Sequence, residues 1–193
     1  MQNSTEKCVI LFVKCPKPGQ VKTRLNLEIT EEQSAKLYTE FIRDTIETLH
    51  NLNLPVEIFI NQIPGEGCKE LDFLQQEFHL QFGSNLGERM KNAFIEVFRY
   101  GYKQAIIIGS DLPDLPDSIM IEAFQALQVK DAVVGPSEDG GYYLLGFKQN
   151  TLLHSVFYGI PWSTGSVYRD TIRELESRAY NTYELKTLND VDD

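Results

Sequence analysis

The chain has 193 residues, of which 42% are hydrophobic and 24% charged, and its formal net charge at pH 7 is -10. This length suits a single domain spanning residues 1–193, which can bury roughly 70% of the surface of its unfolded chain, and the composition argues against disorder. A pI near 4.8 argues against a nucleic-acid partner, because binding a phosphate backbone needs a broad basic surface.

The first apolar run, Val9 to Val13, is five residues long. It is too short for the core of a signal peptide or for a membrane span, so we expect a cytoplasmic protein with no membrane partner. The three cysteines, Cys8, Cys15 and Cys68, are odd in number and lack C-x-x-C spacing. They indicate neither a disulfide framework nor a zinc site, and we expect reduced thiols.

Strands and helices are expected to alternate along the chain. Buried strands are predicted at 8–13, 56–60, 105–108 and 132–134, where apolar residues run together. Amphipathic helices are predicted to begin after Thr30, which forms a capping box with Gln33, near Leu86, at Asp117 as N-cap, and near Ser163 or Thr164. This order predicts a three-layer α/β/α fold with a mainly parallel sheet, whose ligands lie outside the carboxyl ends of the strands.

The loop "CPKPGQVKTRL" after the first predicted strand is cationic and contains no acid. Its prolines stiffen the approach, Gly19 permits a tight turn, and Lys22, Thr23 and Arg24 then offer donors beside backbone N–H groups, with Lys14 just before them. Such a loop suits a diphosphate, although a turn with solvated lysines fits the same residues. The spacing is neither that of a Walker loop nor that of a dinucleotide-binding fold.

Asp111 follows the third predicted strand within "AIIIGSDLPDLP". At the carboxyl edge of the sheet, this carboxylate could bind a divalent cation or a ribose hydroxyl. The alternative is an aspartate that only caps a turn.

The segment "GPSEDGGYYLLGF" has two interpretations that the sequence leaves open. Asp139 and Gly140 suit a hairpin turn between two strands. Alternatively, Gly140 and Gly141 let the backbone approach a sugar while Glu138 or Asp139 accepts hydroxyl hydrogen bonds or acts as a base.

Two further features have both structural and functional interpretations. The closing "LNDVDD" suits a solvated tail. Alternatively, it forms an extended segment in which Asp190 and Asp192, being two residues apart, point to the same side. The only tryptophan, Trp162, suits core packing or a stacking wall for a base or sugar.

Together, "ILFVKCPKPGQVKTRL", "GSDLPDL", "GPSEDGGYYLLGF", "WST" and "LNDVDD" resemble a small bacterial family of proposed glycosyltransferases. This family belongs to the GT-A-like nucleotide-diphospho-sugar transferases, and its members are associated by name with arsenosugar biosynthesis. The resemblance covers nearly the whole chain. Gln20 departs from the pattern, because an arginine is common at this position.

The resemblance implies roles for individual residues. The nucleotide diphosphate would be held by the cationic loop, through Lys14, Gly19, Lys22, Thr23 and Arg24. Asp111 corresponds to the metal-site aspartate of GT-A folds, and the C-terminal D-x-D of related guanylyltransferases maps onto Asp190 and Asp192. A Mg²⁺ or Mn²⁺ ion bridging carboxylates and phosphate oxygens would remove the repulsion between them.

We therefore expect a metal-dependent transferase that moves a sugar from a nucleotide-diphospho-sugar to a small acceptor. Asp139 would orient the sugar or deprotonate the acceptor, and the residues expected to contact substrate are Glu138, Gly140, Gly141, Tyr142 and Trp162. A nucleotidyltransferase joining an NTP to a phosphorylated small molecule is the nearest alternative. A nucleotide-sugar-binding module without chemistry is the other.

Overall fold

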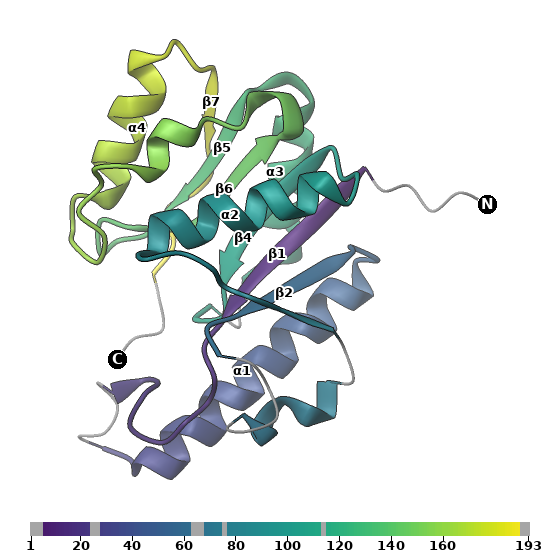
Figure 1. Cartoon of the computed structure of the whole chain (residues 1–193), viewed down its shortest axis with the longest axis vertical. Coiled ribbons are helices and arrows are strands. Elements are labelled where there is room, and N and C mark those ends of the chain that lie inside the picture. The colour runs from purple at the N-terminus through teal and green to yellow at the C-terminus, as the bar shows by residue number, and fades with distance from the viewer. Residues whose placement is uncertain (1–5, 24–27, 63–67, 75–76, 113–114, 190–193) are drawn as a thin grey trace.

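The computed structural model describes residues 6–23, 28–62, 68–74, 77–112 and 115–189. Within these ranges the chain forms a seven-stranded sheet in the order β3-β2-β1-β4-β6-β5-β7, flanked by helices (Figure 1). The strands are β1 Lys7–Val13, β2 Val56–Ile60, β3 Phe78–Leu80, β4 Gln104–Gly109, β5 Ala132–Pro136, β6 Tyr142–Lys148 and β7 Thr182–Glu184. The α-helices are α1 Glu31–Asn51, α2 Leu86–Arg99, α3 Asp117–Val129 and α4 Val167–Ser177, and short 3-10 helices include η2 Lys69–Leu74 and η4 His154–Phe157. No helix among the described residues is long and apolar enough to cross a membrane.

The sheet is mainly parallel, as predicted. β1 pairs in parallel with β2 and β4, β2 with β3, and β5 with β7, whereas β6 runs antiparallel to both β4 and β5. β6 is reached from β5 by a hairpin rather than by a helical crossover, so its amino end lies at the same edge of the sheet as the carboxyl ends of the parallel strands. This places the 137–141 loop beside the end of β4.

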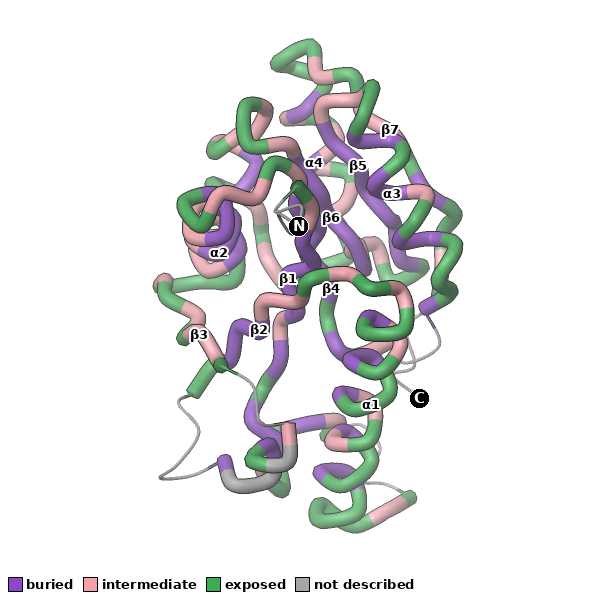
Figure 2. Tube along the Cα trace, turned by 90° about the vertical axis from the view of Figure 1, so that its right-hand side faces the viewer, coloured by how far each residue is buried: buried purple, intermediate pink, exposed green. Residues whose placement is uncertain are grey.

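Two hydrophobic layers lie on opposite faces of the sheet. Along β1, Val9, Leu11 and Val13 face the layer that contains the buried sides of α1 and α3. Cys8 and Ile10 face the layer formed with α2, η4 and α4. Because side chains alternate across a strand, a strand covered on both faces is buried almost continuously, as the central strands are in Figure 2. The predicted three-layer α/β/α architecture is confirmed.

Helix starts agree with the sequence in two cases and differ in two. The capping box predicted for α1 is present, with the Gln33 backbone N–H donating to Thr30 Oγ1. α3 begins at Asp117 itself, after Pro116 as N-cap, so Asp117 is not the N-cap and instead places its charge in the first turn. α4 begins at Val167, later than expected, because Thr164 folds back and its Oγ1 donates to the carbonyl of Pro161 at 2.7 Å.

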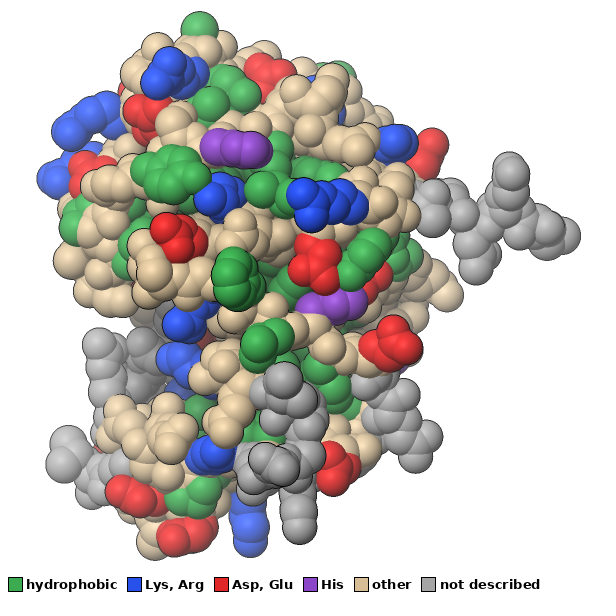
Figure 3. Space-filling view, in the orientation of Figure 1, with side chains coloured by type: hydrophobic (Ala, Val, Ile, Leu, Met, Phe, Trp, Pro, Cys, Tyr) green, Lys and Arg blue, Asp and Glu red, His purple; other side chains and the backbone are tan. Residues whose placement is uncertain are grey.

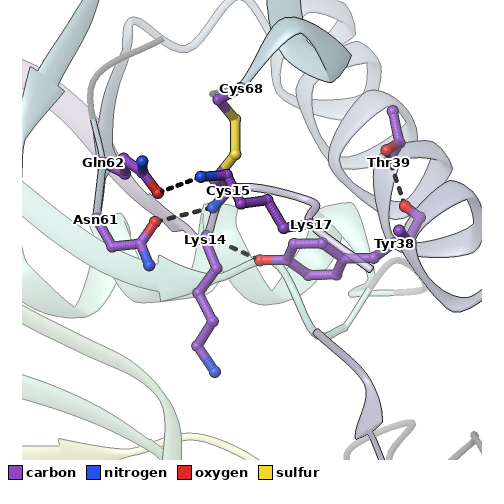
Figure 4. The surroundings of a disulfide bond; sticks show 9 residues. Lys14, Cys15, Lys17, Tyr38, Thr39, Asn61, Gln62 and Cys68 are labelled. Carbon is purple, nitrogen blue, oxygen red and sulfur yellow. Dashed lines mark hydrogen bonds between the residues drawn. A yellow bond between two sulfur atoms is a disulfide. The ribbon is translucent and has the colours of Figure 1, made fainter. Parts of the chain in front are cut away.

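The prediction that all three cysteines are reduced is wrong. Cys15 and Cys68 form a disulfide with their Cα atoms 5.6 Å apart, and both are buried (Figure 4). They follow β1 and β2, which are neighbouring strands, so the sheet brings together two residues 53 positions apart. Cys8 is free and lies in the core, where burial and the nearby Glu57 charge raise the pKa of its thiol.

Candidate active site

A cavity of about 710 Å³ opens at the carboxyl edge of the sheet, where the strand pattern predicted a ligand site. Its wall includes the ends of β1 and β4, one face of α2, the β5–β6 hairpin and the loop before α4. The space-filling view is hollowed on its left side, between the part of the molecule that carries α2 and α4 and the part that carries α1 (Figure 3). The charged side chains in the described lining are Lys14, Arg89, Asp111 and Asp139.

Tyr38 of α1 joins the ends of β1 and β4. Its hydroxyl accepts a hydrogen bond from the backbone N–H of Lys14 at 3.0 Å and lies 2.5 Å from the hydroxyl of Ser110. Burial, with a smaller contribution from the Asp111 charge, raises the pKa of Tyr38 to about 12. Tyr38 therefore stays neutral and links the backbone after β1 to the Ser110 side chain after β4.

Among the described residues of the predicted phosphate loop, Lys14 lines the cavity. Its side chain is exposed and extends away from the disulfide, while its backbone is held by Tyr38 (Figure 4). The next residue, Cys15, donates its backbone N–H to Asn61 Oδ1 at 2.8 Å. These contacts place one ammonium group at the end of β1, where an anionic ligand can reach it.

Lys22 and Asp111, predicted to bind phosphate and metal respectively, form an ion pair. Lys22 Nζ lies 3.1 Å from Asp111 Oδ1, and the two side chains are 3% and 46% exposed. The ammonium of Lys22 also lies 5.6 Å from the centre of the Phe41 ring. Lys22 is therefore placed beneath the cavity wall and neutralises the aspartate that does line the cavity.

Gly19 and Thr23 of the same loop are not part of the described cavity lining. Gly19 has φ of +73°, so it supplies the predicted turn, and a Cβ there would lie 3.0 Å from the Glu31 carboxylate. Thr23 is exposed. Arg24 lies outside the described residues.

Asp111 can act as a carboxylate ligand for a divalent cation. It is half-exposed, lines the cavity and offers the oxygen donors that Mg²⁺ prefers. In the ranges that the structure describes, no three His, Cys, Asp or Glu side chains gather as a metal site. Asp190 and Asp192 lie outside those ranges, but the chain just before them runs along the β5–β6 hairpin, with Leu188 N–H donating to the Pro136 carbonyl at 3.1 Å.

Asp139 belongs to the predicted hairpin turn and also lines the cavity, and its role toward a sugar or acceptor stays a prediction. Its Oδ1 accepts hydrogen bonds from Ser137 Oγ at 2.6 Å and from the Gly141 backbone N–H at 2.8 Å. These two bonds hold the carboxylate in place at the cavity, which Gly141 and Tyr142 also line. Burial raises the pKa of the Tyr142 hydroxyl, so Tyr142 is a neutral wall residue.

Gly140 and Glu138 are not part of the described cavity lining, and their contact with a substrate stays a prediction. A Cβ on Gly140 would collide with the carbonyl of Gly165, so the missing side chain at Gly140 permits close contact between two loops. Glu138 is exposed, is not part of the cavity lining, and donates its backbone N–H to Leu188 O at 3.1 Å.

Trp162 packs against the core, as one of its two interpretations predicted, and also lines the cavity, where stacking on a base or sugar stays a prediction. It lies directly on the first turn of α2, where a Cβ on Gly87 would come within 2.5 Å of the indole. On the same helix, Arg89 lines the cavity with Leu86 and Met90. The sequence predicted an amphipathic helix near Leu86 but no site residue on it, because an arginine within a helix has no motif around it that indicates a ligand, so Arg89 was missed.

Comparison with known proteins places the chain in a family. A family model for an uncharacterized protein conserved in bacteria (DUF2064) matches residues 45–164. The chain belongs to the DUF2064 family. A proposed nucleotide-diphospho-sugar transferase from Desulfovibrio desulfuricans G20 has 37% sequence identity and a TM-score of 0.88, over 96% of this chain and 82% of that one.

Two further similarities are to a guanylyltransferase and to a synthetase whose structure contains CTP. This DUF2064 protein is 24% identical to the 2-phospho-L-lactate guanylyltransferase of Methanocaldococcus jannaschii over 75% of its own length, and the match spans 62% of that enzyme. CMP:2-keto-3-deoxy-manno-octonic acid synthetase complexed with CTP is similar at the level of fold, with a TM-score of 0.58 and 9% identity over 97% of this chain and 93% of that one. The chain therefore has the fold of nucleotide-diphospho-sugar transferases, as its motifs predicted.

Proposed function

We propose that this DUF2064 protein transfers a sugar from a nucleotide-diphospho-sugar to the hydroxyl of a small acceptor. The observation that carries the proposal is the placement of Lys14, Asp111 and Asp139 around one cavity. The relative of similar fold from Desulfovibrio desulfuricans G20, itself a proposed nucleotide-diphospho-sugar transferase, supports it.

In this mechanism Lys14 binds the diphosphate, because it presents an exposed ammonium at the end of β1. Asp139 takes the proton of the acceptor hydroxyl on Oδ2, since Oδ1 is held by the hairpin. The acceptor oxygen forms a bond to the anomeric carbon, the bond from that carbon to the diphosphate breaks, and the nucleoside diphosphate leaves. Trp162 and Tyr142 form the wall beside the sugar.

A divalent cation, Mg²⁺ or Mn²⁺, would neutralise the charge that develops on the departing diphosphate. Asp111 would hold it, together with Asp190 and Asp192. Because Asp111 already pairs with Lys22, a bound cation would share this carboxylate with the lysine. We expect weak metal binding by the protein alone and stronger binding once the diphosphate supplies further oxygen ligands.

Nucleotidyl transfer is the second candidate, favoured by the match to the guanylyltransferase. There the same cavity would bind an NTP, and the acceptor would be a phosphorylated small molecule. The two reactions release different products, since sugar transfer releases a nucleoside diphosphate and nucleotidyl transfer releases pyrophosphate.

The experiment that tests the proposal begins with calorimetric titration of UDP, GDP, their sugars and the matching NTPs, with and without Mn²⁺. The nucleotide that binds is then incubated with a panel of acceptors, and nucleoside diphosphate and pyrophosphate are both measured. Diphosphate release that depends on the acceptor supports sugar transfer, and pyrophosphate release supports nucleotidyl transfer. Binding without either product would overturn both reactions in favour of a binding module.

A matched pair of variants tests the role of Lys14. Lys14→Gln removes the ammonium from the cavity, and a charge-assisted hydrogen bond contributes roughly 1.5–3 kcal/mol, so nucleotide affinity should fall about 10- to 150-fold. Lys17→Gln is the control, because Lys17 lies in the same loop but bonds to Gln62 and does not line the cavity. Equal losses in the two variants would contradict the assignment.

A further inference from the structure

Arg89 brings a positive charge into the cavity from α2 and has no role in the mechanism proposed for sugar transfer. α2 directs Leu86, Arg89 and Met90 to the cavity because residues three and four apart lie on one helix face. The start of this helix is well determined. Asn85 Oδ1 accepts the Glu88 backbone N–H at 2.9 Å.

The guanidinium is anchored by one bond and offers its other donors to a ligand. Arg89 Nε donates to the carbonyl of Gly83 at 3.2 Å. A guanidinium has five N–H donors, so four more belong to its two terminal nitrogens. Within the described part of the chain, no carboxylate forms an ion pair with Arg89 and no other acceptor bonds to it.

Other arginines of this chain, which has a net charge of -10, pair with an acid on the surface, as Arg43, Arg173 and Arg178 do. An arginine that keeps its terminal nitrogens for a cavity is suited to a planar or tetrahedral anion. Guanidinium binds carboxylate and phosphate through two parallel hydrogen bonds.

A series of contacts connects Arg89 to the side of the cavity that carries Asp139. Two residues before it, Gly87 lies against Trp162, and the same loop continues to Gly165, which touches Gly140 of the hairpin. Lys14 and Asp111 are joined by another series of contacts, through Tyr38 and Ser110. The cavity therefore has one cation at the end of β1 and another on α2, the helix whose first turn contacts Trp162.

We propose that Arg89 is a specificity residue that binds an anionic group, phosphate or carboxylate, on the acceptor. This inference rests on the proposed function, since it assumes that the nucleotide occupies the side of Lys14. It narrows the acceptors to small hydroxyl compounds that also carry a negative charge. A neutral alcohol of the same size would leave the terminal donors of Arg89 without an acceptor, at a cost to binding.

The test measures binding of three probes that share a carbon skeleton: glycerol, glycerate and glycerol 3-phosphate. Each is titrated into the intact protein by calorimetry, alone and with saturating nucleotide, for the wild type, Arg89→Gln, Arg89→Lys and Arg99→Gln. Arg99 is the control, because it is the last residue of the same helix and is exposed. The nucleotide is titrated separately into every variant.

We expect one or both anionic probes to bind the wild type and glycerol to bind at least about tenfold more weakly. Arg89→Gln should lower the affinity for the anionic probe about tenfold or more, Arg89→Lys should lose less because it keeps the charge, and Arg99→Gln should change nothing. Preference for glycerate identifies a carboxylate, and preference for glycerol 3-phosphate identifies a phosphate.

Several outcomes would overturn the inference. These are equal binding of glycerol and the anions, no binding of either anion, or a loss of nucleotide affinity in Arg89→Gln with the anionic probes unaffected. The last result would assign Arg89 to the nucleotide. Failure of the proposed function is a separate result, because the wild type would then bind no nucleotide whether or not Arg89 binds the anionic probes.

Discussion

The ion pair between Lys22 and Asp111 is asymmetric, and this asymmetry makes a sharp prediction about stability. The lysine side chain is 3% exposed, whereas the aspartate is 46% exposed. Asp111→Asn removes the charge that faces a buried ammonium, and water cannot easily reach that ammonium. Lys22→Met removes the buried charge and leaves a carboxylate that water can solvate.

The expected magnitudes follow from this difference. Breaking a fully buried pair costs about 3–5 kcal/mol, but half-exposure of Asp111 reduces that figure, and we expect Asp111→Asn to lower the free energy of unfolding by about 1.5–3 kcal/mol. For a chain of this length, such a loss lowers Tm by about 3–12 °C. Lys22→Met should cost less than about 1 kcal/mol, because a buried methionine keeps contact with the Phe41 ring.

The assay is urea unfolding at neutral pH, supported by thermal melts, on the wild type and the two variants. Asp117→Asn is the control, since Asp117 is an exposed aspartate in the first turn of α3, away from the cavity lining, and should change stability by less than about 0.5 kcal/mol. If Lys22→Met destabilised the protein as much as Asp111→Asn, the reasoning from burial would be refuted. Addition of nucleotide with Mn²⁺ should stabilise the wild type more than Asp111→Asn.

Three further predictions concern residues that hold the walls of the cavity in place. Reducing the disulfide at Cys68, or replacing Cys68 by Ser, should lower the free energy of unfolding by up to about 4 kcal/mol for a loop closed over 53 residues; unchanged melts with and without a reductant would count against the pairing. Tyr38→Phe should lower the free energy of unfolding by about 1–2 kcal/mol. Folding raises the pKa of Tyr38 from 10.0 to about 12, so the wild type should lose stability more steeply than the variant as the pH increases through this interval. Parallel curves of stability against pH for the two proteins would refute this contribution of the Tyr38 hydroxyl. Gly87→Ala should displace Trp162, lower the free energy of unfolding by about 1–3 kcal/mol and weaken ligand binding. A variant with the Tm of the wild type would show that the indole can move without loss of stability.

The elements of this fold were largely predictable because their apolar patterns are local. The runs of β1 and β2, the buried face of α1 and its capping box all depend on residues within one segment, and each appears within about a residue of its expected place. β3 and β7 are three residues long and only partly buried, so they carry no readable period. Their pairing with β2 and β5 comes from the sheet itself.

The candidate site was predictable to the level of its strand ends. Lys14, Asp111 and Asp139 were singled out because each follows or joins strands whose ends meet at one edge of the sheet, and all three line the cavity. The sequence could not indicate that Lys22 turns away from the ligand side to pair with Asp111. A lysine in a sequence can be recognised as a possible partner for an anion, but the sequence does not show whether that anion is a ligand or a carboxylate of the protein itself.

By itself, the sequence determined the fold class, the edge of the sheet that carries the site, and the family, since these follow from periodicity and from motifs that are contiguous in the chain. Only the tertiary structure decided that Cys15 meets Cys68, that Lys22 is buried under Asp111, and that Arg89 joins the cavity beside Trp162. The physical reason is the same in each case. These contacts join segments distant in the chain, and their geometry depends on how helices and loops pack on a sheet, which no local pattern records.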